Sequence, residues 1–217
     1  GSFISANGEI DTEISHRTSK ASFIVSKLRR SVWHQKDLTI KTKMNVYRAC
    51  VLRALLHGSE TWCTKKRHIE KLEAFHMRNL RTLLGIMYSD HVSNTVVRKK
   101  AGMRETINVE FQENRLRWLG HVERMENTRL PKQVLHGQLN NGSRAAHKPR
   151  KRWVDCIRED LRCFGIPESS WATRCQDRTK WRYALRKGKA KATKEAEKHN
   201  IAIAKRRSKR KAEKNFA

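Results

Sequence analysis

The sequence is short of acidic side chains and has no long hydrophobic run. Its 217 residues include 21 Asp and Glu against 49 Lys and Arg, a formal net charge of +28. No stretch approaches the roughly 20 apolar residues that a membrane-spanning helix needs. The N-terminal residues also lack the basic and apolar regions of a signal peptide. We therefore expect a soluble intracellular protein with no membrane partner, whose charge is neutralised by nucleic acid.

Cysteine is scarce, and its spacing argues against two kinds of site. The five cysteines are an odd number without close pairs, which favours reduced thiols over a disulfide framework. Zinc sites have closely spaced ligand pairs such as Cys-x2-Cys. Cys156 and Cys163 instead lie two helical turns apart, about 10 Å by helical rise. We predict no metal site and no cofactor in this chain.

The carboxylates are too scattered for polymerase or nuclease chemistry. Two-metal enzymes cluster carboxylates around divalent cations, and Walker-type enzymes need a glycine-rich loop that ends in Gly-Lys-Ser or Gly-Lys-Thr. Neither pattern occurs, and Asp155 and Glu159 are explained as helix salt-bridge partners of neighbouring arginines. The sequence therefore predicts no catalytic residue.

The apolar residues of the sequence show strong helical periodicity. Apolar residues repeat at intervals of three and four over residues 11–33, 39–58 and 65–85, so we predict three helices in an α-helical bundle. Thr39 is the expected N-cap of the second helix. Arg17 falls on the outer side of the first helix, where it would meet phosphate or water.

Further helices are predicted in the second half of the chain. Ser93 and Thr106 are expected to cap two of them. Another begins at Trp153 and is closed by Gly165. Ser169 would cap the next, which carries Trp171, Cys175, Arg178 and Trp181 near one face, where an exposed Trp beside Arg is able to stack on a base.

The helix around residues 115–125 is the main candidate for binding a polyanion. Apolar residues occupy one face and cations repeat on another, although an ordinary amphipathic surface helix has the same pattern. Residues 139–147 read as a loop, and the basic run 148–152 that follows binds phosphate by plain attraction. We expect sugar-phosphate contacts from Arg115, Arg117, His121, Arg124, Lys148, Arg150, Lys151 and Arg152.

Residues 186–217 are strongly basic, with 13 Lys and Arg against 3 Asp and Glu. They have almost no large apolar residue, so they cannot form a core of their own. We expect a tail that is disordered or becomes helical on an anion. Residues 205–211 suit a nuclear import signal, so the expected location is the nucleus, with the cytoplasm as a second site.

An ordered series of motifs occupies residues 55–62, 72–78, 80–85, 115–125, 130–133 and 142–153. Together they resemble the C-terminal part of reverse transcriptases from non-LTR (long interspersed, LINE-type) retrotransposons. The resemblance covers about residues 1–185. The chain departs from the usual pattern at His57, where the family has Tyr, and at His147-Lys148, where Gly-Arg commonly precedes the proline.

This resemblance implies an all-α fold with four parts. Residues 1–10 would be a remnant of the preceding palm region and residues 11–104 a thumb-like helical bundle. Residues 105–185 would form a smaller basic helical segment with the loop 139–152, and residues 186–217 the tail. The catalytic carboxylates and their Mg²⁺ would lie upstream, outside this chain.

The function implied is that of a nucleic-acid-binding fragment of an RNA-directed DNA polymerase. Such a thumb holds template RNA and primer DNA through sugar-phosphate contacts, so the expected partners are RNA, DNA or an RNA–DNA hybrid. Three alternatives stay open at this point. One is a chain that is itself an active enzyme. Another is a non-enzymatic nuclear protein, derived from a retrotransposon remnant, that binds RNA or chromatin. The third is a translated, decayed element copy without a selected function.

Overall fold

The computed structural model describes residues 2–3, 9–137 and 151–215, with side chains as far as Arg206 in the last helix. Within these ranges the chain forms α-helices and short 3-10 and π-helical segments, and no strand. The all-α prediction is therefore confirmed. Residues 4–8, in the expected palm remnant, and residues 138–150, in the expected loop, lie outside the described residues.

The chain divides into two compact units. Unit 1 consists of Gly1–Gly58, Lys65–Val109 and Thr193–Ala217, and unit 2 consists of Ser59–Thr64 and Glu110–Ala192. Two long helices, α6 (Ile107–Glu123) and α10 (Arg178–Asn215), contribute to both units.

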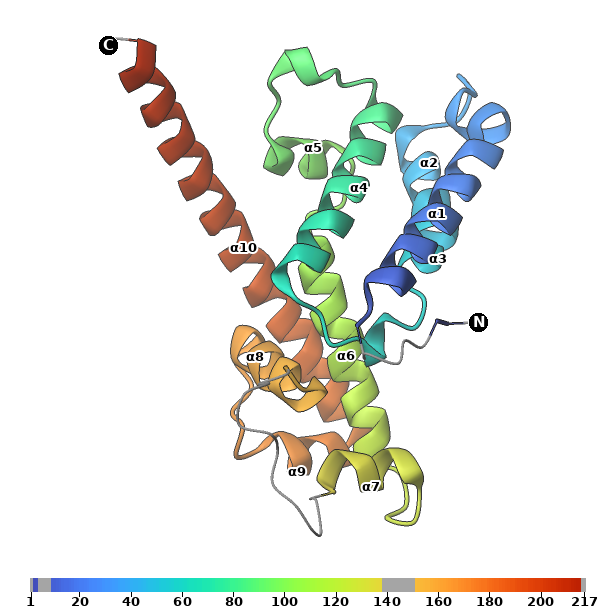
Figure 1. Ribbon diagram of the computed structural model, residues 1–217, viewed down its shortest axis with the longest axis vertical. Coiled ribbons are helices and arrows are strands. Elements are labelled where there is room, and N and C mark those ends of the chain that lie inside the picture. The colour runs from blue at the N-terminus through green and yellow to red at the C-terminus, as the bar shows by residue number, and fades with distance from the viewer. Residues whose placement is uncertain (1, 4–8, 138–150, 216–217) are drawn as a thin grey trace. The chain divides into compact units, whose positions relative to one another are not determined.

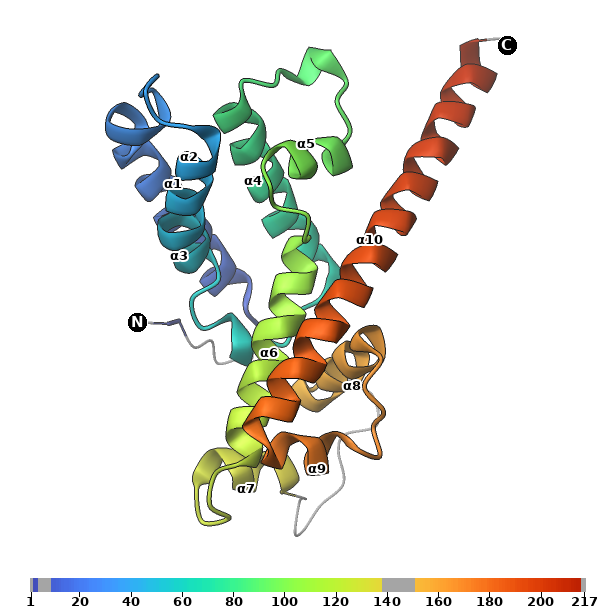
Figure 2. The same cartoon turned by 180° about the vertical axis from the view of Figure 1, so that it is seen from behind.

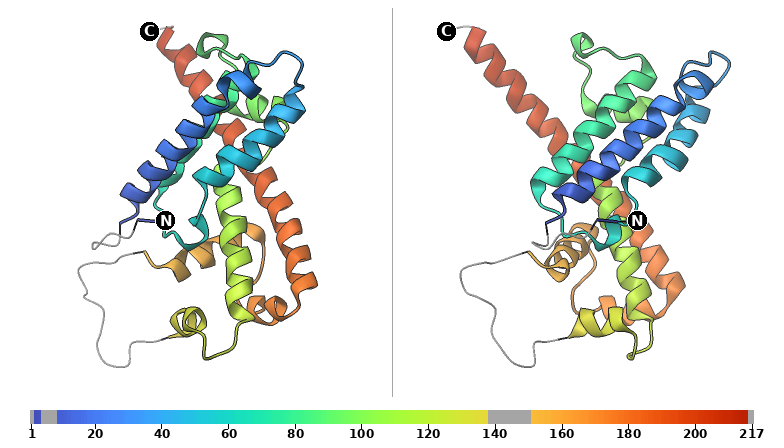
Figure 3. Two further views of the ribbon diagram at one scale, coloured as in Figure 1. Left: turned by 90° about the vertical axis from the view of Figure 1, so that its right-hand side faces the viewer. Right: turned by 45° about the vertical axis from the view of Figure 1, so that its right-hand side comes forward.

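Unit 1 is built around α1 (Asp11–Lys27) and α4 (Lys66–Leu84). A π-helical segment, η1 (Arg29–Trp33), extends α1 to the predicted end of the first helix. The second predicted helix comprises α2 (Ile40–Val46), η2 (Tyr47–Leu52) and α3 (Arg53–Leu55), and Figures 1 and 3 show this stretch running beside α1. Their shared core buries Ile14, Ala21, Tyr47, Val51, Leu55, Leu72 and Leu80.

Helix ends in unit 1 follow the predicted capping residues. Thr39 Oγ1 accepts a hydrogen bond from Thr42 N at 3.2 Å at the start of α2. Ser93 Oγ accepts from Val96 N at 3.4 Å at the start of α5 (Asn94–Lys100), after the 3-10 segment η4 (Tyr88–Asp90). Thr106 Oγ1 accepts from Val109 N at 3.3 Å. Each hydroxyl satisfies a backbone donor that the first helical turn leaves unpaired, so these predictions are confirmed.

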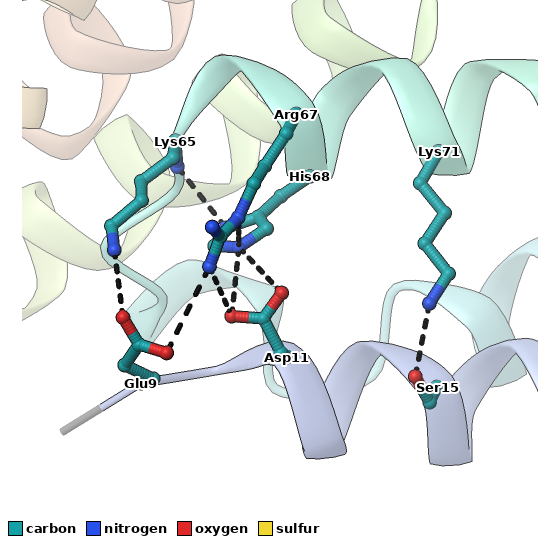
Figure 4. Close-up of polar contacts among 7 residues, drawn as sticks. All are labelled: Glu9, Asp11, Ser15, Lys65, Arg67, His68 and Lys71. Carbon is teal, nitrogen blue, oxygen red and sulfur yellow. Dashed lines mark hydrogen bonds and ion pairs between the residues drawn. The ribbon is translucent and has the colours of Figure 1, made fainter. Parts of the chain in front are cut away.

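Charged side chains join the N-terminal ends of α1 and α4, as Figure 4 shows. Glu9 lies 3.0 Å from Lys65, and Asp11 lies 2.6 Å from Arg67 and 3.3 Å from His68. The carboxylate of Asp11 lies in the first turn of α1, where the helix dipole favours a negative charge. Exposed pairs of this kind contribute little one by one, so the cluster mainly fixes how the two helix ends meet.

Arg17 corrects a prediction made for α1. Its side chain is only 5% exposed, and its Nε donates to Glu13 Oε1 at 2.6 Å. Glu13 in turn accepts a hydrogen bond from the backbone N of Phe3 at 2.7 Å. The N-terminal residues therefore cover this side of α1, and the expected contact of Arg17 with phosphate or solvent is wrong. Helical periodicity does not show which face a neighbouring segment covers.

Unit 2 packs α6, from Glu110 onward, against α8 (Trp153–Phe164) and the first part of α10. Figure 2 shows α6 and α10 side by side there, with α7 (Leu130–His136) and α9 (Trp171–Gln176) near the same end. The 3-10 segment η3 (Ser59–Thr61) and the residues up to Thr64 also belong to this unit. The core buries Trp62, Phe111, Leu116, Leu119, Ile157, Leu161, Phe164, Trp181 and Leu185.

The helix predicted to start at Ser169 is divided in two. Ser170, rather than Ser169, precedes α9, and Asp177 separates α9 from α10. Asp177 Oδ1 accepts hydrogen bonds from the backbone N of Thr179 at 2.8 Å and of Lys180 at 3.0 Å. The carboxylate thus acts as the N-cap of α10. Helix α10 then continues past residue 186, where the basic tail was expected to begin.

Gly120 allows α6 and α10 to approach closely. A Cβ atom at this position would lie 2.2 Å from Trp181 Nε1 and 2.5 Å from its Cδ1. Trp181 is buried, and its Nε1 donates to Leu116 O at 3.1 Å. The indole therefore occupies the space that any other residue at 120 would need.

Replacing Gly120 with alanine is expected to lower the free energy of unfolding by up to about 2 kcal/mol. Overpacking of the core costs about 1–3 kcal/mol, and the better helix propensity of alanine returns about 1 kcal/mol. Urea denaturation checks the value, with His121→Ala as the control at the adjacent exposed position. A Gly120→Ala variant about 1 kcal/mol more stable than the wild type, as helix propensity alone predicts, would show that Trp181 does not pack against this glycine.

Candidate functional site

Arg115 is buried inside unit 2, which overturns its predicted contact with phosphate. Its side chain is 4% exposed, and its Nε and Nη2 donate to the two carboxylate oxygens of Asp160 at 2.6 and 2.8 Å. Its Nη1 donates to Thr64 Oγ1 at 2.8 Å. A guanidinium enclosed in this way cannot reach a nucleic-acid strand. The prediction is wrong because Asp160, on α8, draws the side chain inward.

The remaining predicted residues of α6 differ in exposure. Arg117 is 67% exposed and pairs with Glu113 one turn earlier at 2.7 Å. His121 is exposed, with its ring 5.2 Å from that of Trp118. Arg124 is half-buried, and its Nη1 donates to Cys175 O at 2.7 Å. Arg117 and His121 thus remain accessible, whereas Arg124, the residue after the end of α6, holds that end of the helix against α9.

Lys151 and Arg152 are exposed at the start of α8, but both have acidic partners. Lys151 Nζ lies 2.6 Å from Glu159 Oε2, and Arg152 Nη2 lies 3.1 Å from Asp155 Oδ1. Hydrogen bonds from the side chain and backbone of Arg152 hold the pKa of Asp155 below its usual value. Surface pairs contribute at most about 1 kcal/mol, so a polyanion competes with them easily. The other two predicted residues of this run, Lys148 and Arg150, lie outside the described residues.

A second cationic surface, absent from the sequence predictions, lies on α10. Between Arg178 and Ala192 the helix has seven Lys and Arg and no acidic residue. Trp181, Leu185 and Ala192 are buried on one side, so the opposite side carries exposed groups. We call this surface the α10 basic face, and define it as Lys180, Arg182, Tyr183, Arg186 and Lys187.

The α10 basic face combines cations with an accessible aromatic ring. Tyr183 is 59% exposed, and the guanidinium of Arg186 lies 5.5 Å from the centre of its ring. Lys180, 3.5 Å from Asp177, forms the one ion pair that the described residues show for this face. Arg182 and Arg186 are one helical turn apart, as are Tyr183 and Lys187, so donors follow one another about every 5–6 Å along the helix. This arrangement suits a sugar-phosphate backbone, and the tyrosine is able to stack on a base.

The spacing of the buried residues in the sequence is enough to predict the α10 basic face, because it identifies which side of the helix is covered. Trp181, Leu185, Gly188 and Ala192 repeat at intervals of 4, 3 and 4, which is helical periodicity. The composition becomes strongly basic at residue 186 and predicts a tail there, which separates the two halves of this repeat. Trp181 was itself a candidate for base stacking, but it is only 2% exposed and that role is excluded.

The described residues form neither a metal-binding cluster nor a membrane-spanning helix. Residues 2–3, 9–137 and 151–215 contain no group of three or more His, Cys, Asp or Glu placed to hold a metal ion. Among the same residues, no helix combines the length and the apolar character that crossing a bilayer requires.

One curated protein shows measurable similarity to this chain. It is an uncharacterized protein of Caenorhabditis elegans whose name describes it as transposon-derived. The two sequences are 26% identical over 154 residues, which cover 68% of this chain and 55% of the worm protein. The chain thus spans about half the length of that relative. No protein-family model matches the chain, and no solved structure matches it.

Proposed function

We propose that this chain is the nucleic-acid-binding, thumb-like part of a reverse transcriptase from a LINE-type retrotransposon. The similarity to a transposon-derived protein supports a transposon-related origin. The net charge of +28 supports a polyanionic partner. The expected partners are RNA, DNA or an RNA–DNA hybrid, and the expected location is the nucleus.

The observation that carries the proposal is the α10 basic face. It offers four exposed cations and one exposed tyrosine on the regular surface of a helix, with a buried opposite side that fixes their orientation. Contacts to phosphate position a strand without reading its bases. The chain should therefore bind nucleic acid with little sequence preference, as a thumb that moves along a template must.

Binding is expected to weaken steeply with salt. If four cations of the α10 basic face each neutralise one phosphate, the log-log slope of affinity against salt is about −3 to −4, at 0.7–0.9 per phosphate. Fluorescence anisotropy with a labelled RNA–DNA hybrid, single-stranded RNA and duplex DNA gives this slope for each partner. An affinity that does not change between low and high salt would rule out the proposal.

The proposal assigns bond formation to residues outside this chain. The carboxylates of Asp160 and Glu73 are held in structural pairs with Arg115 and Arg98. Incubation of the pure chain with a primed template, Mg²⁺ and nucleotides should leave the primer unextended. Primer extension that persists through purification would instead make the chain an enzyme in its own right.

A further inference from the structure

Two cysteines that are far apart in the sequence lie together in unit 2. Cys63, in the segment between η3 and α4, and Cys156, in the first turn of α8, are separated by 93 residues, yet their sulfur atoms are 3.7 Å apart. Cys156 is fully buried and Cys63 is half-buried. The sulfur pair is therefore reachable from solvent on one side only.

Neighbouring groups favour a thiolate at this pair. The hydrogen bond between the two sulfur atoms and the nearby charges of Arg115 and Lys151 lower the pKa of Cys156 to about 7. The same hydrogen bond and burial raise the pKa of Cys63. The first proton of the pair is thus lost near neutral pH, and a thiolate, unlike a thiol, attacks an oxidant.

A metal ion is a poor occupant for the two sulfurs. No third His, Cys, Asp or Glu completes a ligand set around them among the described residues. The carbonyl oxygen of Lys151 lies 2.8 Å from Cys63 Sγ. Structural zinc sites need four ligands, mostly sulfur or nitrogen. Among the described residues, the pair therefore has the partners for sulfur–sulfur chemistry and lacks those for zinc.

We propose that Cys63 and Cys156 are a redox-active dithiol that closes to a disulfide when a peroxide reacts with it. Peroxide reaches the pair from the side of the half-buried Cys63. The thiolate sulfur of the pair attacks one peroxide oxygen, the O–O bond breaks, and a sulfenic acid and hydroxide form. The other sulfur then displaces hydroxide from the sulfenic acid and loses its own proton. In total, two thiols and one hydrogen peroxide give one disulfide and two water molecules.

The geometry allows the bond to form with a small movement. The sulfur atoms must close from 3.7 Å to about 2.05 Å, the length of a disulfide. Cys63 lies between two helical segments, so its backbone is not constrained by a helical hydrogen-bond pattern. The new bond would tie residues 59–64 to α8, beside the contact of Thr64 with Arg115.

Peptide mapping of the oxidised full-length chain tests this proposal. The folded protein is treated with hydrogen peroxide, remaining thiols are blocked with N-ethylmaleimide, and the protein is digested without reductant. Mass spectrometry should detect a peptide pair that joins Cys63 to Cys156 and separates on addition of dithiothreitol. Cys50, which is exposed, should carry the maleimide.

Two variants sharpen the result. Cys50→Ser should form the cross-link as the wild type does, whereas Cys156→Ser should lose it. Circular dichroism establishes that both variants are folded. Recovery of Cys63 and Cys156 as maleimide adducts or sulfinic acids after peroxide treatment of the wild type would overturn the proposal, as would cross-links spread over all five cysteines. The wild-type result decides the matter even if Cys156→Ser does not fold.

Discussion

Replacing Arg115 with alanine is expected to lower the free energy of unfolding by about 3–5 kcal/mol. Breaking a buried ion pair by removing one partner leaves the other charge uncompensated, and losses of this size are typical. Asp160, with a side chain only 1% exposed, would be left without the two hydrogen bonds that its carboxylate accepts from Arg115. Thr64 would lose its partner as well. Urea unfolding followed by circular dichroism measures the change.

Arg117 supplies the matched control for this experiment. It lies two positions further along α6, but its side chain is 67% exposed and its ion pair with Glu113 lies on the surface. Arg117→Ala should stay within about 0.5 kcal/mol of the wild type. If Arg115→Ala lost no more stability than Arg117→Ala, the Arg115 side chain would have to be exposed to solvent. Its predicted contact with nucleic acid would then again be possible.

Acidification from pH 6.5 to 4.5 is expected to remove about 2 kcal/mol of stability through a single buried histidine. His76 is 2% exposed, and its Nδ1 lies 3.1 Å from the hydroxyl of Tyr47. Burial, with a smaller contribution from Arg98 and Arg48, lowers the pKa of His76 from 6.5 to about 3. Between these values the unfolded chain binds a proton that the folded chain does not. The stabilisation that neutral His76 provides is therefore complete above pH 6.5, the pKa in the unfolded chain. It is lost as the pH falls towards about 3, the pKa in the folded chain.

Urea titrations at several pH values measure this dependence, which has a slope of about 1.4 kcal/mol per pH unit below the unfolded pKa. His76→Gln, whose side-chain oxygen is able to accept the Tyr47 hydrogen bond, should remove most of the slope. His121→Gln makes the same change at an exposed position and should leave the slope as in the wild type. Equal slopes for the two variants would mean that His76 is not the group responsible.

Most of the fold could be predicted because it follows from local rules. Thr39 and Ser93 cap their helices as expected. Gly85 and Gly165, both with positive φ, end α4 and α8 where the apolar repeats stop. Capping and periodicity depend on residues within a few positions of one another, so the sequence displays them directly. The resemblance to retrotransposon polymerases added the ordered motifs but did not determine which side chains are exposed.

The candidate site was harder to predict because exposure depends on distant residues. Arg115 and Arg117 differ little in the sequence, yet Asp160, 45 positions away, draws only the first into the core. Arg124 was placed on an outer face, but the backbone of Cys175 covers it in part. The α10 basic face was not predicted because a change in composition hides the helix that carries it. The buried repeat from Trp181 to Ala192 crosses residue 186, where the sequence becomes strongly basic and suggests that the folded part of the chain ends.

Charge reversal on the α10 basic face tests the central claim most directly. The double variant Arg182→Glu with Lys187→Glu is compared with Arg162→Glu with Arg174→Glu, which makes the same change in net charge at exposed positions of α8 and α9 in unit 2. Anisotropy with the RNA–DNA hybrid should show at least about tenfold weaker binding for the α10 variant, and a salt slope smaller by about 2. The control should retain most of the wild-type affinity and slope. Equal losses in both variants would show that binding follows net charge alone and would contradict the assignment of the nucleic-acid interface to α10.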